Sequence, residues 1–333
     1  MKIVGAGLQA FADSTGFTVA DFNQRFPWLG ADLQTVRNSF IKPRLGHEVS
    51  RRLCVPIGGG KALNVAVSQH SNEENSGKAL VLVHGLGGSE SSSYMENTAQ
   101  YFYAQGWHVY RMNYRGVGAS RETSVPPYSA GLTGDMRAVL RAVAAEEGVD
   151  KVCAMGFSLG GQLLMRTLGE GDVEPKLCAV VTVSAPLDLA TSQQKLERRR
   201  NALYVRYLVG NMKKDMEGIS HPAITMPLDE IRSVLAFDEH VIAPYFGFAS
   251  AQDYYRCVSC KMVLEKINIP LLAIHSEDDP WIPVEDYLSA RWPVNAAAGA
   301  LLLQKGGHVG FHGSKASVAW FKPAAATFFK NFT

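Results

Sequence analysis

The stretch ValCysAlaMetGlyPheSerLeuGlyGly, residues 152–161, decides the fold class. Its first six residues are mostly apolar, as in a short buried strand, and an apolar pattern with helical spacing follows at 162–168. Between the two, Gly156, Ser158 and Gly160 match the pattern G-x-S-x-G. Small residues on both sides of the serine allow a tight turn between a strand and a helix. The stretch therefore predicts an α/β protein that presents a serine at the carboxyl end of a strand.

The sequence on both sides of this stretch alternates short β-branched runs with longer helical patterns. Such alternation is typical of crossover units on a mostly parallel central sheet flanked by helices. The expected strands lie at 79–84, 107–112, 152–157, 178–184, 271–275 and 300–304, and the expected helices at about 93–105, 132–147, 162–168, 284–290 and 316–330.

The alternation stops after Pro186, which indicates an insertion in the α/β core. Residues 188–265 carry mostly helical patterns and no clear buried strand. We therefore predict an N-terminal extension at 1–47, an α/β core formed by 48–187 and 266–333, and a helical cap at 188–265. A chain of 333 residues is long enough for one large α/β domain with such an insertion.

Composition excludes several classes of protein. Hydrophobic residues make up 47% of the chain and charged residues 19%, which is a globular composition. The formal net charge of +2 is too small for a general attraction to nucleic acid or to an anionic membrane. The longest apolar runs are shorter than the roughly 20 residues that span a bilayer. Five cysteines, an odd number, argue against a disulfide framework, so we expect a cytoplasmic protein with reduced thiols.

A nucleophilic serine needs a histidine base and a carboxylate that orients the histidine. Downstream of Ser158, the acid candidates follow the expected strand at 271–275: Asp279 is favoured because ProTrpIlePro comes directly after it, Asp278 competes with it, and Glu277 is a remote third. His308 lies on a glycine-rich loop after the last strand and is the candidate base. The alternatives fit less well, since we interpret His312 as a surface or supporting residue and His275 as a satisfied core histidine.

An acyl-transfer site also needs N–H donors for the developing oxyanion. HisGlyLeuGlyGly at 84–88 follows a strand and occupies the loop position from which such a donor comes. We assign the backbone N–H groups of Leu86 and Leu159 to this hole. His84 is interpreted as a structural residue that holds the loop.

At this point the sequence resembles the YheT-like α/β hydrolases, which are related to eukaryotic acylglycerol and phospholipid lipases. The motifs that carry the resemblance are PheProTrpLeuGlyAlaAspLeuGlnThr at 26–35, HisGlyLeuGlyGlySerGluSerSerSerTyr at 84–94, AsnTyrArgGly at 113–116, GlyPheSerLeuGlyGly at 156–161, SerAlaProLeuAspLeu at 184–189, AspTyrTyrArg at 253–256 and GlyGlyHisValGlyPhe at 306–311. The resemblance implies an α/β-hydrolase fold and a Ser-Asp-His ester hydrolase, with Ser158, Asp279 and His308 on the family's catalytic positions. It thins across about 190–250.

These observations predict a serine carboxylesterase that hydrolyses short- to medium-chain esters through an acyl-enzyme, with no cofactor or metal and a small-molecule ester as its partner. Two alternatives use the same triad, namely an acyltransferase that acts on an alcohol and an acylglycerol lipase. A third is a noncatalytic binding protein on a hydrolase fold. A membrane partner is not expected, and the sequence leaves the oligomeric state open.

Two further features are given ordinary structural interpretations. Cys257 and Cys260 lack a second cysteine pair at zinc-site spacing and are interpreted as incidental thiols. The basic segment 195–206 is interleaved with apolar residues up to Leu208, which predicts an amphipathic cap helix whose apolar side faces the pocket or the core.

Overall fold

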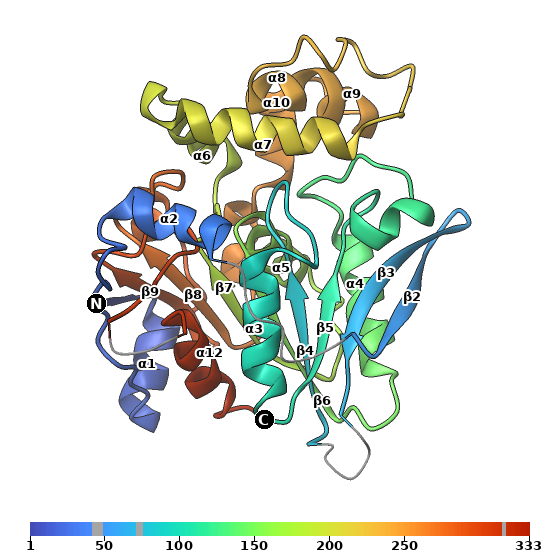
Figure 1. Ribbon diagram of the computed structural model, residues 1–333. Coiled ribbons are helices and arrows are strands. Elements are labelled where there is room, and N and C mark those ends of the chain that lie inside the picture. The colour runs from blue at the N-terminus through green and yellow to red at the C-terminus, as the bar shows by residue number, and fades with distance from the viewer. Residues whose placement is uncertain (42–48, 71–75, 315–317) are drawn as a thin grey trace.

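A nine-stranded sheet forms the centre of the computed structural model, which describes residues 1–41, 49–70, 76–314 and 318–333 (Figure 1). The strand order is β1-β9-β8-β7-β6-β4-β5-β3-β2. The strands from β9 to β5 in this order pair in parallel, whereas β1, β3 and β2 join antiparallel. The strands are β1 Lys2–Val4, β2 Arg51–Gly58, β3 Lys61–Ser68, β4 Lys78–Val83, β5 His108–Met112, β6 Lys151–Phe157, β7 Leu177–Val183, β8 Leu271–Ser276 and β9 Ala298–Leu303.

Both faces of the sheet are covered because successive side chains of a strand point to opposite sides. In β4, Leu80 and Leu82 belong to one buried cluster, and Val81 and Val83 belong to another. This is why the central strands read as continuous apolar runs. The helices that cover the faces are α1 Ala6–Thr15, α3 Ser93–Tyr103, α4 Thr133–Ala144, α5 Leu159–Glu170, α11 Val284–Ser289 and α12 Phe321–Phe329.

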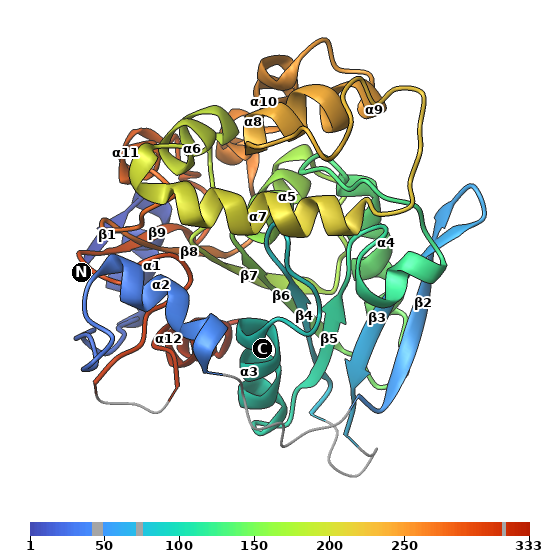
Figure 2. The ribbon, with the colours of Figure 1, turned by 45° about the horizontal axis from the view of Figure 1, so that its top comes forward.

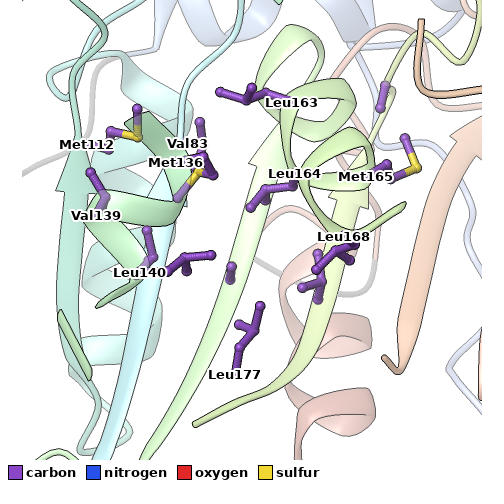
Figure 3. Close-up of a cluster of buried hydrophobic side chains, with 14 of the residues drawn as sticks. Val83, Met112, Met136, Val139, Leu140, Leu163, Leu164, Met165, Leu168 and Leu177 are labelled. Atoms are coloured by element: carbon purple, nitrogen blue, oxygen red, sulfur yellow. The ribbon is translucent and has the colours of Figure 1, made fainter. Parts of the chain in front are cut away.

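The two buried clusters divide these helices between the faces. Residues of α1, α3 and α12 pack with one set of strand side chains, on the face turned toward the viewer in Figure 1. On the opposite face, Met136, Val139 and Leu140 of α4 and the leucines of α5 pack against Val83 and its neighbours (Figure 3). This packing fixes α5, and therefore the turn that precedes it, against the sheet.

The chain between β7 and β8 contains helices only and lies over the carboxyl ends of the parallel strands (Figure 1). We call residues 188–265 the helical insertion. It has its own buried cluster, which includes Val205, Phe237 and Tyr254. Its main helices are α6 Leu189–Leu196, α7 Ala202–Asp215, α8 Val234–Phe237, α9 Ala243–Phe246 and α10 Ala251–Val258, and a π-helical turn, Asp238–Ile242, joins α8 to α9.

The strands and helices expected for the core are present, with ends shifted by a few residues. The largest difference is in the last helix, which begins at Phe321 rather than near residue 316; residues 316 and 317 lie outside the described part, as does the expected domain boundary at 47 and 48. The N-terminal segment also contributes elements that the sequence did not suggest. β1 pairs with β9 at the edge of the sheet, and α2, Ala31–Phe40, lies beside the helical insertion (Figure 2).

Candidate active site

Ser158 sits in a strained turn between β6 and α5. Its φ of +50° lies in the left-handed region, which is costly for a residue with a side chain. The turn is possible only because the surrounding glycines leave room: a Cβ on Gly156 would lie 2.5 Å from the carbonyl oxygen of Gly160, and one on Gly160 would lie 2.4 Å from that of Val83. The turn therefore has the geometry that the G-x-S-x-G pattern predicts.

Asp279 and His308 form a buried hydrogen-bonded pair at the same end of the sheet. Nδ1 of His308 lies 2.9 Å from Oδ2 of Asp279, and the two residues are 4% and 1% exposed. The other oxygen of Asp279 accepts the backbone N–H groups of Trp281 and Ile282, at 2.8 and 3.0 Å. Burial favours a raised pKa for the Asp279 carboxyl, but His308 and the donated hydrogen bonds outweigh it, and the pKa is lowered. Asp279 is therefore held as a carboxylate.

The competing carboxylates do not reach His308. Asp278 accepts the backbone N–H of Gly307 at 2.9 Å and so supports the loop rather than the imidazole ring, while Glu277 is exposed. Of the acid candidates from the sequence, only Asp279 contacts the candidate base.

The two other histidines near the site are both buried, which agrees with the core interpretation of His275 and with the supporting, not the surface, interpretation of His312. His275 is a core residue stacked on Tyr287 with ring centroids 4.2 Å apart, and its Nδ1 lies 3.9 Å from Oδ2 of Asp279. Burial lowers the pKa of His275 to about 4, which keeps the ring neutral. His312 is not a surface residue, since it is 6% exposed and its Nδ1 lies 3.1 Å from Nη1 of Arg37. His275 is buried because it lies in the central strand β8, and His312 is buried because its loop packs against α2.

Ser158 and His308 line the same cavity, which has a volume of about 230 Å³ and opens between the sheet and the helical insertion. No hydrogen bond joins the Ser158 hydroxyl to His308 within the described chain. Such bonds are often long in unliganded hydrolytic sites and shorten when substrate binds. Trp281 covers the imidazole of His308, with ring centroids 4.1 Å apart, and limits its contact with water.

The loop after β4 lies close to Ser158. A Cβ on Gly85 would lie 3.0 Å from the Cβ of Ser158, so the backbone of this loop is close to the serine. Neither the N–H of Leu86 nor that of Leu159 donates a hydrogen bond within the described part of the chain, and both residues line the cavity. Two N–H groups are therefore free beside the serine, as a hole for an oxyanion requires.

The side chains of Tyr128, Asn211 and His84 hold this loop in place. Tyr128 accepts the N–H of Gly87 at 3.0 Å, and Asn211 of α7 donates to the Gly87 carbonyl at 3.1 Å. His84 is fully buried and bonds to the Gly85 carbonyl at 2.8 Å, in agreement with its interpretation as a structural residue. Burial lowers the pKa of His84 to about 4, so it adds no charge to the site.

Sequence reasoning missed the contribution of α2. Thr35 Oγ1 accepts the backbone N–H of His308 at 2.9 Å, and Gln34 exchanges hydrogen bonds with the backbone of His312. Both residues lie in the motif at 26–35, which was the available signal. The N-terminal segment therefore braces the loop that carries the candidate base.

The basic segment is only partly as expected. The segment forms the end of α6, a short turn and α7 instead of one helix. Leu208 of α7 is buried and lines the cavity, and Tyr207 lines the cavity although it is 61% exposed. Leu203 is 81% exposed and does not line the cavity. Across the described residues, no group of histidine, cysteine and acidic side chains is arranged to hold a metal ion.

The chain is similar to a known protein family over most of its length. A family model described as serine aminopeptidase, S33 (Hydrolase_4) matches residues 74–291. The chain belongs to this α/β-hydrolase family. The matched range contains Ser158 and Asp279 and ends before His308.

Relatives of this hydrolase have names that agree with the resemblance. It is 30% identical, over 76% of both chains, to the Escherichia coli protein named "Putative esterase YheT". It is 26% identical, over 78% of its own length and 61% of the relative's, to monoacylglycerol lipase of Saccharomyces cerevisiae. These relationships assign the hydrolase to the carboxylic ester hydrolases.

Solved structures confirm the fold of the hydrolase. It superposes on an esterase of Pyrococcus furiosus, Pf2001, with a TM-score of 0.58 and 14% identity, over 95% of this chain and 99% of the other. Helices of the length and apolarity needed to cross a membrane do not occur in the described ranges.

Proposed function

We propose that this hydrolase is a serine carboxylesterase that acts on short- to medium-chain esters through an acyl-enzyme, with Ser158, Asp279 and His308 as its catalytic triad. The observation that carries the proposal is that the Asp279–His308 pair opens into the cavity that also contains the strained Ser158 turn. A pair of this kind supplies the base that a serine hydroxyl needs at neutral pH.

In the proposed reaction, Nε2 of His308 takes the proton of the Ser158 hydroxyl as its oxygen attacks the ester carbonyl. Asp279 stabilises the imidazolium through Nδ1. The N–H groups of Leu86 and Leu159 bind the oxyanion, and the proton on His308 passes to the departing alcohol. A water molecule, deprotonated by His308, then releases the acid and restores Ser158.

The cavity supports the proposed size of the substrate. Its volume of about 230 Å³ is below the roughly 300–1,000 Å³ of sites that enclose drug-sized ligands. Its lining is mainly apolar, with Leu208, Met212, Phe237 and Ile242 from the helical insertion. We infer that the helical insertion acts as a cap that closes the acyl pocket.

The proposal is tested with p-nitrophenyl esters from acetate to palmitate, using the wild-type protein and Ser158→Ala. We expect turnover that is highest for short or medium chains and lost in the variant, whose circular dichroism spectrum stays that of the wild type. Turnover that persists in a folded Ser158→Ala protein would overturn the assignment of the nucleophile. A maximum at palmitate would favour a lipase, and ester formation in added ethanol that outruns hydrolysis would favour an acyltransferase.

A further inference from the structure

The cavity carries two acidic side chains in its wall and, among the described residues that line it, no lysine or arginine. The carboxyl groups are those of Asp215 and Asp238. Both come from the helical insertion, Asp215 as the last residue of α7 and Asp238 as the first residue of the π-helical turn. An apolar pocket gains nothing from buried carboxyl groups unless a ligand uses them, because burial of a charge without a partner is unfavourable.

Asp238 is 8% exposed, and its one hydrogen-bond partner in the described chain is the hydroxyl of Tyr255, which donates to Oδ2 at 2.6 Å. Burial raises the pKa of Asp238 to about 7; Tyr255 opposes this shift and the charge of Glu197 adds to it. No cation accompanies this carboxyl group in the described chain. π-Helical turns are uncommon and occur often at functional sites.

Asp215 provides the second carboxyl group of this wall. Its Oδ2 is buried and makes no hydrogen bond within the described chain. The nearby guanidinium of Arg121 donates to the backbone carbonyls of Lys214, Asp215 and Glu217, not to the carboxyl group. Burial raises the pKa of Asp215 to about 6, and Arg121 and Lys214 only moderate the shift.

Tyr128 links the two carboxyl groups to the site. Tyr128 lines the same cavity as both carboxyl groups, and its pKa is raised mainly by burial and further by the charges of Asp215 and Asp238. Tyr128 also accepts the N–H of Gly87 in the loop beside Ser158. An aromatic ring together with carboxylates is the environment that binds ammonium groups, through the ring's negative face and through ion pairing.

We propose that the substrate of this esterase carries a cationic ammonium group, which binds in the part of the cavity lined by Asp215, Tyr128 and Asp238. This inference rests on the proposed ester hydrolysis and specifies its substrate class. The ammonium group supplies a counter-charge to Asp238, which has none in the described chain, and an ion-pair partner to Asp215, whose carboxyl group is not hydrogen-bonded to the nearby Arg121. The same wall disfavours anionic esters, because like charges repel strongly in a partly desolvated cavity.

The test compares esters that differ in charge but not in shape. Butyrylcholine is paired with 3,3-dimethylbutyl butyrate, which has carbon in place of the ammonium nitrogen. The p-nitrophenyl esters of 4-(trimethylammonio)butanoate and 5,5-dimethylhexanoate place the same difference on the acyl side. We expect kcat/KM to be about tenfold higher for the cationic member of at least one pair. Equal or lower values for the cationic members of both pairs, with turnover that requires Ser158, would overturn the inference and leave the esterase proposal intact.

Substitutions in the cavity wall and a binding measurement test the ammonium inference separately from the esterase proposal. We expect Asp238→Asn and Asp215→Asn each to reduce the cationic-to-neutral ratio severalfold, whereas Glu230→Gln, which removes an exposed charge of the same insertion, leaves the ratio unchanged. Calorimetry on folded Ser158→Ala should show that choline binds about tenfold more tightly than 3,3-dimethylbutanol. If the protein turns over no ester, the calorimetric comparison tests the inference by itself. Equal binding of choline and 3,3-dimethylbutanol would then overturn the inference.

Discussion

The backbone N–H of His308 donates a hydrogen bond to the hydroxyl of Thr35, which lies 273 positions earlier in the chain. Thr35 is in α2, a helix outside the α/β core expected from the sequence, and it touches the backbone rather than the imidazole ring. It therefore acts on the reaction by positioning the proposed base.

Thr35→Val keeps the shape of the side chain but leaves the His308 N–H without an acceptor. Because a lost hydrogen bond of this kind is worth about 1 kcal/mol, we expect kcat to fall about fivefold while KM changes little. Steady-state kinetics on a short p-nitrophenyl ester measure both constants. Thr35→Ser should restore kcat, and a variant series in which only KM or only thermal stability changes would contradict the positioning role.

Asp279→Asn and Asp278→Asn separate the two adjacent carboxylates. The neutral amide in Asp279→Asn cannot stabilise the imidazolium of His308, and we expect kcat to fall by about 10⁴. The amide oxygen in Asp278→Asn can still accept the N–H of Gly307, so kcat of this variant should fall less than tenfold. Comparable losses in the two variants, measured with the same ester, would contradict the assignment of Asp279.

Gly160→Ala tests the close packing behind the Ser158 turn. The new Cβ would lie 2.4 Å from the carbonyl oxygen of Val83, a backbone atom that cannot move without displacing β4, and we expect a loss of about 3 kcal/mol or more in the free energy of unfolding. Gly210→Ala is the matched control, because it lies in α7 with no atom within 4 Å of the new Cβ and should gain about 0.5–1 kcal/mol. Urea denaturation measures both. Equal effects would be inconsistent with the crowding described at the turn.

Asp238→Asn should stabilise the protein at pH 8 more than at pH 5. The Asp238 carboxyl has a pKa of about 7 in the folded protein and about 4 in the unfolded chain. Between these pH values the folded wild type binds a proton that the unfolded chain has lost, so the stability of the wild type falls as pH rises from about 4 to 7. Asparagine does not titrate and still accepts from Tyr255. Melting temperatures at the two pH values give the comparison, with Glu230→Gln as control. A difference between variant and wild type that stays constant with pH would count against the burial of this charge.

The sequence was sufficient to predict the central strands, the serine turn and the acid and base candidates, because each rests on a local pattern. Strands such as β4 are uninterrupted apolar runs, and the turn needs glycines at fixed spacing. The contact between Asp279 and His308 follows from the order of strands, since both loops leave the carboxyl ends of neighbouring parallel strands, β8 and β9.

Other parts of the site depend on contacts that no local pattern records. β1 has only three residues and pairs with the last strand of the sheet, so its place depends on a distant partner. The free carboxyl group of Asp215 and the buried one of Asp238 lie in a helical insertion without a recognised motif, and their common cavity exists only in the folded chain. The sequence pattern predicts that Leu203 faces inward, but the packing of α7 leaves it in solvent.

The bond between Thr35 and His308 also sets an order for assembly during synthesis. At roughly 5–20 residues per second, the ribosome adds the loop of His308 about 14–55 s after α2. Ser158 is added 123 residues after Thr35, so for the remaining 150 residues of the interval the chain contains Ser158 and its glycines, while Gln34 and Thr35 still lack the loop to which they bind. A nascent chain is therefore expected to acquire reactivity toward esters abruptly, when its C-terminal strand and loop join the sheet, and not gradually as the serine turn forms.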